Sequence, residues 1–189
     1  MQRRPPVSVR PTAATSAWRG RAVAVLIVMT VGISAVPPAH ADALARATAA
    51  YNHGDYVRAA RELSVLAAHG NSRAQGLLGF LYEHGFGVPQ AYDAAADLYA
   101  QAAAQGNPFA QAMFGLMYDK GHGVSRDVIL AYKWLDLAAA HTRGKERDAY
   151  ARFRNAVASK MSPDEIALGQ RLALNWVPGA FVAPVRIPR

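Results

Sequence analysis

Apolar residues recur at spacings of three and four along most of the chain after residue 42. The apolar positions of one such segment are Ala74, Leu77, Leu78, Leu81 and Tyr82, and those of the next are Ala95, Leu98, Tyr99, Ala102 and Ala103. This spacing gathers each set on one side of an α-helix. The pattern therefore predicts an all-α fold built from pairs of amphipathic helices.

The helix pair is repeated along the chain. Residues 74–105 and 110–141 align at a constant shift of 36 positions (110 minus 74). The matched positions are Ala74 with Ala110, Gly79 with Gly115, Tyr82 with Tyr118, Gly85 with Gly121, Gly87 with Gly123, and Ala95 with Ala131. The same shift carries Gly106-Asn107 back to Gly70-Asn71, which indicates a third, divergent unit before residue 70. A period of about 20 to 50 residues is typical of an α-solenoid, in which the units stack.

Glycine and polar residues mark the helix ends. The apolar pattern is interrupted by Gly85, Gly87, Gly121 and Gly123, as expected where the chain must adopt a positive φ. Asn71 or Ser72 can cap the helix that follows Gly70, and Ser72 has capping-box spacing to Gln75. Asn107 precedes Pro108 in the same way. Small residues at 74, 79, 95 and 103 predict a close approach of the two helices of a unit.

These residues resemble the Sel-one-like repeat family, relatives of the tetratricopeptide repeats. The resemblance rests on Ala-x4-Gly-x2-Tyr-x2-Gly-x-Gly-Val followed by an alanine-rich helix and a Gly-Asn. It covers residues 74–141 well and 43–70 in part, where His53-Gly54-Asp55 replaces the Gly-x-Gly-Val turn. It implies antiparallel helix pairs whose first helices line a concave groove.

The first 41 residues have the layout of a secretory signal peptide. Five arginines and no acidic residue precede an apolar run at 22–36, and Ala39-His40-Ala41 offers a cleavage site. The run is shorter than the roughly 20 residues that span a bilayer. We expect cleavage after Ala41, export to the periplasm or beyond, and no stable membrane span; the alternative is an uncleaved anchor helix.

Charge and cysteine content exclude several classes of function. The formal net charge is +8, but removal of the leader leaves 16 basic residues (21 minus 5) against 13 acidic ones, so nucleic-acid binding is not expected. The absence of cysteine excludes disulfides and thiolate metal sites. We expect the remaining chain to comprise a divergent helix pair at 42–70, two repeats at 71–142, capping helices at 143–176 and a Pro-rich, extended or disordered tail at 177–189.

The C-terminal cap has a clear start signal. Ser162, Pro163 and Glu165 form a capping-box sequence that opens the last helix. The preceding basic segment, 143–160, could contact anionic lipid, but Glu146 and Asp148 lie within it and favour a soluble capping face.

No catalytic motif is found, and no cofactor or enzymatic activity is expected. His84 and His122 flank the glycine turns, but their unit positions differ and they lack carboxylates in a ligand spacing, so no metal site is predicted. Asp93 and Asp97 share a helical face, where solvated carboxylates are a simpler interpretation than an acid/base pair. The aromatic residues at helical spacing fit a core better than a ligand cage.

The candidate site is the surface of the first helices. The residues predicted to contact a partner are Gln75, Phe80, Glu83, His84, Gln111, Leu116, Asp119 and Lys120. They include a repeated amide and a repeated carboxylate; the alternative is that these polar residues only keep the scaffold soluble. We expect a non-enzymatic exported adaptor that binds a protein or peptide in the bacterial cell envelope. An envelope hydrolase or peptidoglycan-binding protein is the alternative.

Overall fold

The computed structural model describes residues 38–180 and residue 184 of the chain. All regular secondary structure within these residues is helical, as the sequence predicts. The helices are α1 (Pro38–Asn52), α2 (Tyr56–Ala68), α3 (Ser72–His84), α4 (Tyr92–Ala104), α5 (Pro108–Lys120), α6 (Val128–Ala140), α7 (Gly144–Ala158) and α8 (Pro163–Leu174). They fall in one compact unit, Val36–Arg189. The apolar run of the predicted signal peptide lies outside the described residues, and α1 extends across the predicted cleavage position.

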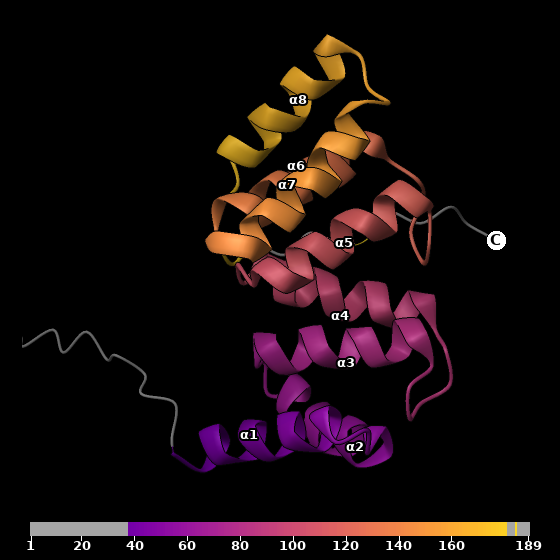
Figure 1. The fold of residues 1–189 in the computed structure, drawn as a ribbon, viewed down its shortest axis with the longest axis vertical. Helices are drawn as coiled ribbons and strands as arrows, with labels where there is room; N and C mark the ends of the chain where they lie inside the picture. Colours follow the sequence, from indigo (N-terminus) through magenta and orange to yellow (C-terminus); the bar gives the residue numbers. More distant parts are fainter. Residues whose placement is uncertain (1–37, 181–183, 185–189) are drawn as a thin grey trace, which may run out of the picture. The chain divides into compact units, whose positions relative to one another are not determined.

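Successive helices pack side by side in chain order. Each helix from α1 to α6 contacts the next, so the pairs α1/α2, α3/α4 and α5/α6 are stacked (Figure 1). Both α7 and α8 pack against α6 and cover the end of this stack. The loop between α1 and α2 spans only residues 53–55, whereas residues 85–91 join α3 to α4. The first pair therefore lacks the long glycine turn of the later pairs.

Side-chain caps fix where the helices begin. The Oδ1 atoms of Asn71 and Asn107 each accept a hydrogen bond, from the backbone N–H of Ala74 and of Ala110 respectively, both at 3.0 Å. Such a bond satisfies one of the free N–H groups of the first turn. Of the two caps that the sequence allows for α3, Asn71 is confirmed, and the capping-box spacing of Ser72 is not used because Ser72 lies inside α3. The predicted capping box of Ser162 and Glu165 is confirmed.

The first glycine of each turn ends a helix and does not pack against another one. Gly121 follows α5 with a φ of 74°, and its backbone N–H donates to the carbonyl of Met117 at 2.8 Å. Gly85 ends α3 in the same left-handed conformation, with a φ of 71°. Gly121 is exposed, and a Cβ atom there would lie 3.4 Å from Arg126 Cβ, so backbone conformation and not lack of space favours glycine at this position. The positive φ predicted for Gly121 is confirmed.

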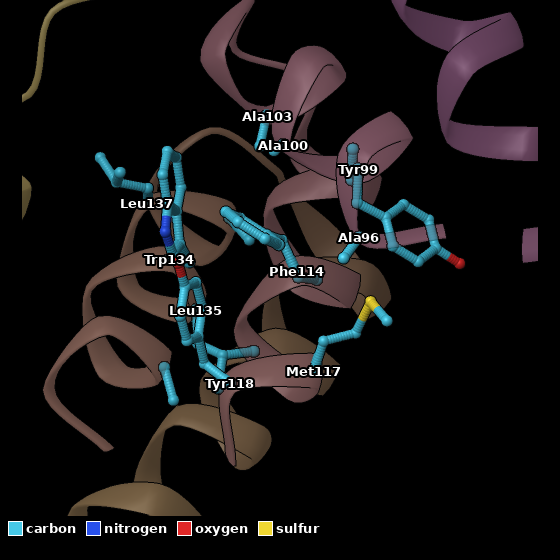
Figure 2. Close-up of a cluster of buried hydrophobic side chains, with 14 of the residues drawn as sticks. Ala96, Tyr99, Ala100, Ala103, Phe114, Met117, Tyr118, Trp134, Leu135 and Leu137 are labelled. Carbon is cyan, nitrogen blue, oxygen red and sulfur yellow. The ribbon is translucent and has the colours of Figure 1, made fainter. Parts of the chain in front are cut away.

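Two other glycines allow close contacts within the pairs. A Cβ atom on Gly79 would lie 2.9 Å from the ring of Tyr99, and one on Gly115 would lie 2.9 Å from Leu135 Cγ. Figure 2 shows the core beyond these contacts, where Phe114, Trp134 and Tyr118 pack together between α5 and α6. The predicted close approach of the two helices of a unit is confirmed.

The described part of the tail returns to the repeats. The Trp176 ring lies 5.5 Å from the His141 ring, and the N–H of Gly179 donates to the carbonyl of Ala104 at 2.7 Å. Residues 177–180 are non-helical, but this hydrogen bond holds them against α4.

Candidate functional site: the face of the first helices

The first helices of successive pairs present matching side chains at one surface. On α3 these are Arg73, Leu77, Phe80 and His84, and on α5 they are Phe109, Met113, Leu116 and Lys120. Each set has spacings of four, three and four, which places its members in one stripe of a helix. All eight are exposed or half-buried. We call the surface formed by these two stripes and the neighbouring side of α1 the first-helix face.

The three first helices meet at this face through aromatic rings. The Phe80 ring of α3 lies 6.1 Å from the Tyr51 ring of α1 and 6.3 Å from the Phe109 ring of α5. The Phe109 ring also covers Gly76, where a Cβ atom would lie 3.3 Å from it. Aromatic contacts at these separations add favourable energy beyond the burial of area.

The aromatic cluster continues beyond the end of α3. Phe80 stacks on His84 with centroids 4.1 Å apart, and Phe86 stacks on Tyr56 at 4.9 Å. Phe86 retains 37% of its surface exposed and His84 is also exposed. A row of partly exposed rings is therefore available to a ligand, in addition to its contribution to packing.

A hollow adjoins this row between α1 and α3. Its volume is ≈ 460 Å³, and it is lined by Leu44, Ala45, Thr48, Ala49, Asn52 and Arg73. The α1 side is mainly apolar, and Arg73 supplies a cation at the beginning of α3. Tyr51 directly precedes Asn52, so the hollow and the aromatic cluster are contiguous along α1.

The repeated glutamines are structural residues. Gln75 and Gln111 were expected at non-core positions, and this prediction is wrong, because they are 3% and 0% exposed. Their Nε2 atoms donate to Ala67 O at 3.2 Å and to Ala103 O at 3.3 Å. A buried amide needs such partners, because a buried polar group without a hydrogen bond is costly. These bonds join each first helix to the end of the preceding pair.

The repeated carboxylates also make internal contacts. Glu83 accepts a hydrogen bond from the hydroxyl of Tyr99 at 2.9 Å, and burial together with the Glu83 charge raises the pKa of Tyr99 strongly. Asp119 forms an ion pair with Lys160 at 2.8 Å and keeps only 17% of its side chain exposed. Four of the predicted partner contacts lie on the first-helix face: His84 and Lys120 are exposed there, and Phe80 and Leu116 are half-buried.

The charge that α3 and α5 contribute to this face is therefore mainly positive. Arg73 and Lys120 are exposed and form no ion pair with a described residue, whereas the only carboxylates of α3 and α5 are Glu83 and Asp119, both engaged. The face combines exposed cations with aromatic and aliphatic surface.

The histidines of the glycine turns lie in separate aromatic pairs. His84 contacts Phe80, and His122 lies 4.6 Å from the ring of Tyr92. Among the described residues no group of three or more His, Asp or Glu side chains is arranged to hold a metal ion. Asp93 is exposed and Asp97 half-buried. In the described part of the chain, no helix is long and apolar enough to cross a membrane.

Several residues of the face or next to it were missed by the sequence analysis. Tyr51, Tyr56, Phe86, Phe109 and Arg73 lie in or next to the aromatic cluster and the hollow. A signal for two of them existed in the repeat, because Arg73 and Phe109 occupy equivalent positions at the 36-residue shift (109 minus 73). The contribution of α1 had no such signal, because its shorter loop puts that helix out of the common register.

The stacked pairs and their face define the class of protein: a helical-repeat scaffold. Residues 72–107 and 108–142 match the model of the Sel1 repeat, so the chain contains two Sel1 repeats. This fold is typically a non-catalytic scaffold for protein interaction.

Solved structures support the same fold. A protective antigen of uropathogenic Escherichia coli, c5321, which displays an SLR fold, matches with a TM-score of 0.66 and 23% identity over 79% of this chain and 34% of that one. A Sel1 repeat protein from Oxalobacter formigenes matches with a TM-score of 0.55 and 29% identity over 72% of this chain and 55% of that one. The chain thus spans about a third and about half of these proteins. No curated protein sequence matches it. The predicted α-solenoid of Sel-one-like repeats is confirmed.

Proposed function

We propose that the protein is an exported, non-enzymatic adaptor that holds a protein partner of the bacterial cell envelope on its first-helix face. The observation that carries this proposal is the continuous row of partly exposed rings joining α1, α3 and α5 beside the hollow at Arg73. Aromatic residues and arginine are enriched in protein interfaces, where a few of them supply most of the binding energy.

Export is proposed from the sequence of residues 1–41. An arginine-rich leader, a short apolar run and a small-x-small site are the features of a cleaved secretory signal. Fractionation of the native host followed by N-terminal sequencing tests this step. A mature protein beginning at Asp42 in the periplasm or medium supports it; a full-length protein in the cytoplasm contradicts it.

Binding on the first-helix face is tested by photo-crosslinking in living cells. A photoreactive amino acid is placed at His84 or at Lys120, which are exposed, and at Val65 on α2, which is 57% exposed, as the matched control. Mass spectrometry then identifies the adducts. A discrete protein adduct from the first two positions and none from Val65 supports the adaptor.

Two results would contradict the adaptor. One is equal labelling from all three positions, which indicates random collision. The other is the absence of any protein adduct combined with retention of the protein on purified peptidoglycan sacculi, which favours the cell-wall alternative.

A further inference from the structure

We propose that the hollow between α1 and α3, together with the adjoining rings of Phe80 and Phe86, forms a groove that binds an extended acidic segment of a partner protein. A carboxylate of that segment contacts Arg73, and a large apolar side chain contacts Phe80 and Phe86. This inference rests on the proposed function and adds the chemistry of the partner. It concerns one groove, so it can fail while the adaptor proposal stands.

The groove offers two kinds of contact at its two ends. At the beginning of α3, Arg73 borders the hollow of ≈ 460 Å³, whose α1 side carries Leu44, Ala45 and Ala49. Toward the end of α3, Phe80 is half-buried and Phe86 is 37% exposed. A guanidinium group binds carboxylates in a two-point geometry, and the rings provide apolar area with little loss of side-chain entropy.

The charges near the groove favour an anionic ligand. Arg73 is exposed and, among the described residues, forms no ion pair with a carboxylate. The carboxylate that α3 does carry, Glu83, accepts a hydrogen bond from the Tyr99 hydroxyl. A basic segment would find no free carboxylate on α3, whereas an acidic one finds an unpaired guanidinium.

The spacing of the two contacts predicts a sequence pattern. Arg73 and Phe80 are seven residues apart (80 minus 73) in one stripe of α3. At 1.5 Å per residue this separates them by about 10 Å along the helix. An extended strand rises about 3.3 Å per residue, so the acidic and the apolar residue of the ligand should be about three positions apart.

Selection of displayed random peptides on the immobilised mature protein tests the inference without assuming a sequence. We expect the enriched peptides to carry Asp or Glu about three positions from Phe, Tyr, Trp or Leu. Enrichment of basic or uncharged peptides would overturn the proposal.

Substitutions then place the selected peptide in the groove. For a labelled selected peptide, Arg73→Glu should weaken binding about ten-fold, since reversal of one charge at an interface replaces attraction by repulsion. Phe86→Ser should weaken it by a similar factor through loss of the exposed ring. The matched controls are Arg61→Glu and Val57→Ser on α2, both at exposed positions, which should leave the affinity within two-fold.

Thermal unfolding of each variant separates loss of binding from loss of folding. All four substituted positions are exposed, so we expect each variant to fold. Equal effects of Arg73→Glu and Arg61→Glu would overturn the placement at Arg73. Binding of the protein to purified sacculi that Arg73→Glu abolishes would overturn the protein partner in favour of cell-wall carboxylates. A crosslinked partner on the first-helix face that competes with no selected peptide would overturn the inference and leave the adaptor intact.

Discussion

Gly123 lies directly against the backbone of Tyr92, the first residue of α4. A Cβ atom at Gly123 would overlap the Tyr92 carbonyl group, and Gly123 has a φ of 66°. The same relationship holds 36 positions earlier (123 minus 87), where Gly87 lies against the backbone of Tyr56. The second glycine of each turn therefore touches the beginning of the second helix of the preceding pair, and this contact sets the distance between stacked pairs.

Substitution of Gly123 should lower the free energy of unfolding by more than its positive φ alone would cause. Gly123→Ala forces a Cβ into the Tyr92 backbone and should lower the free energy of unfolding by at least about 3 kcal/mol, through overpacking and left-handed strain together. Urea denaturation followed by circular dichroism measures it.

The control for that variant is Gly54→Ala. Gly54 also has a positive φ, 79°, but a Cβ there would meet nothing within 4 Å. The Gly54→Ala substitution should lower the free energy of unfolding by only about 1 kcal/mol. Equal losses in the two variants would show that conformational strain, and not contact between pairs, explains the glycine at 123.

Close packing within a pair can be tested at Gly115. A Cβ atom there would lie 2.9 Å from Leu135 Cγ and 3.0 Å from the Ala131 carbonyl oxygen. Gly115→Ala should destabilise the protein by about 1 to 2 kcal/mol, even though alanine is the better helix former by about 1 kcal/mol. Gly76→Ala, whose nearest contact is the Phe109 ring at 3.3 Å, should change stability by less than about 1 kcal/mol. Thermal unfolding of both variants measures these two changes in stability. A Gly115→Ala variant that is more stable than the native protein would contradict the close packing of Gly115 against α6.

The buried amide of Gln111 should contribute measurably to stability. Its Nε2 donates to Ala103 O, and its Oε1 lies 3.2 Å from His141 Nδ1. Gln111→Leu removes both bonds at a fully buried site and should cost about 1 to 3 kcal/mol in chemical denaturation. Gln170→Leu, which removes the 3.3 Å bond from an exposed amide to the Tyr132 hydroxyl, is the control. Its cost should stay below about 1 kcal/mol because the Gln170 amide is exposed and makes a single long bond.

The capping box of α8 predicts a dependence of stability on pH. Hydrogen bonds from the Ser162 backbone and side chain lower the pKa of Glu165 below its ordinary value. A carboxyl group with a lowered folded-state pKa stabilises the folded protein above its unfolded pKa and loses that effect as the pH falls through the folded value. The stability difference between the native protein and Glu165→Gln should therefore be present at neutral pH, shrink as the pH falls below the ordinary pKa of a glutamate, and be lost once the pH lies below the lowered pKa of Glu165.

Ser162→Ala provides an independent check on this cap. It removes the acceptor for the Glu165 N–H and should cost about 1 kcal/mol. If the stability difference between the native protein and Glu165→Gln stayed the same at acidic pH, the charge of the Glu165 carboxylate would have no part in the cap.

Local signals in the chain were sufficient for much of the fold. Asn107 before Pro108 and Ser162 before Pro163 cap helices as predicted, because capping depends on residues within one turn of each other. The small residues at 79 and 95 likewise mark the close approach of α3 and α4. The 36-residue period carried this local information from one pair to the next.

The same period could not tell apart the two glycines of a turn. Gly121 and Gly123 both have a positive φ, but only Gly123 lies against another helix, whereas Gly121 is exposed at the end of α5. A glycine signal in the sequence reports the backbone conformation, and the contact made by each glycine depends on how the pairs stack.

Only part of the site could be predicted in this way. Phe80, His84, Leu116 and Lys120 were placed on the first-helix face because their helical spacing separates them from the core positions. Gln75 and Gln111 were misplaced, since polarity alone indicates exposure and only the neighbouring pair supplies the carbonyl groups of Ala67 and Ala103 that satisfy them.

The sequence by itself determined the helices, their caps and the stacking period, because these depend on side-chain periodicity and on backbone conformations that particular residues favour. Only the tertiary structure decided that Tyr51, Phe80 and Phe109 form one aromatic row, and that Glu83 and Asp119 are engaged by Tyr99 and Lys160. The contacts that link α1, α3 and α5 join residues 29 positions apart (80 minus 51, and 109 minus 80), and no local rule specifies which side chains meet at that separation.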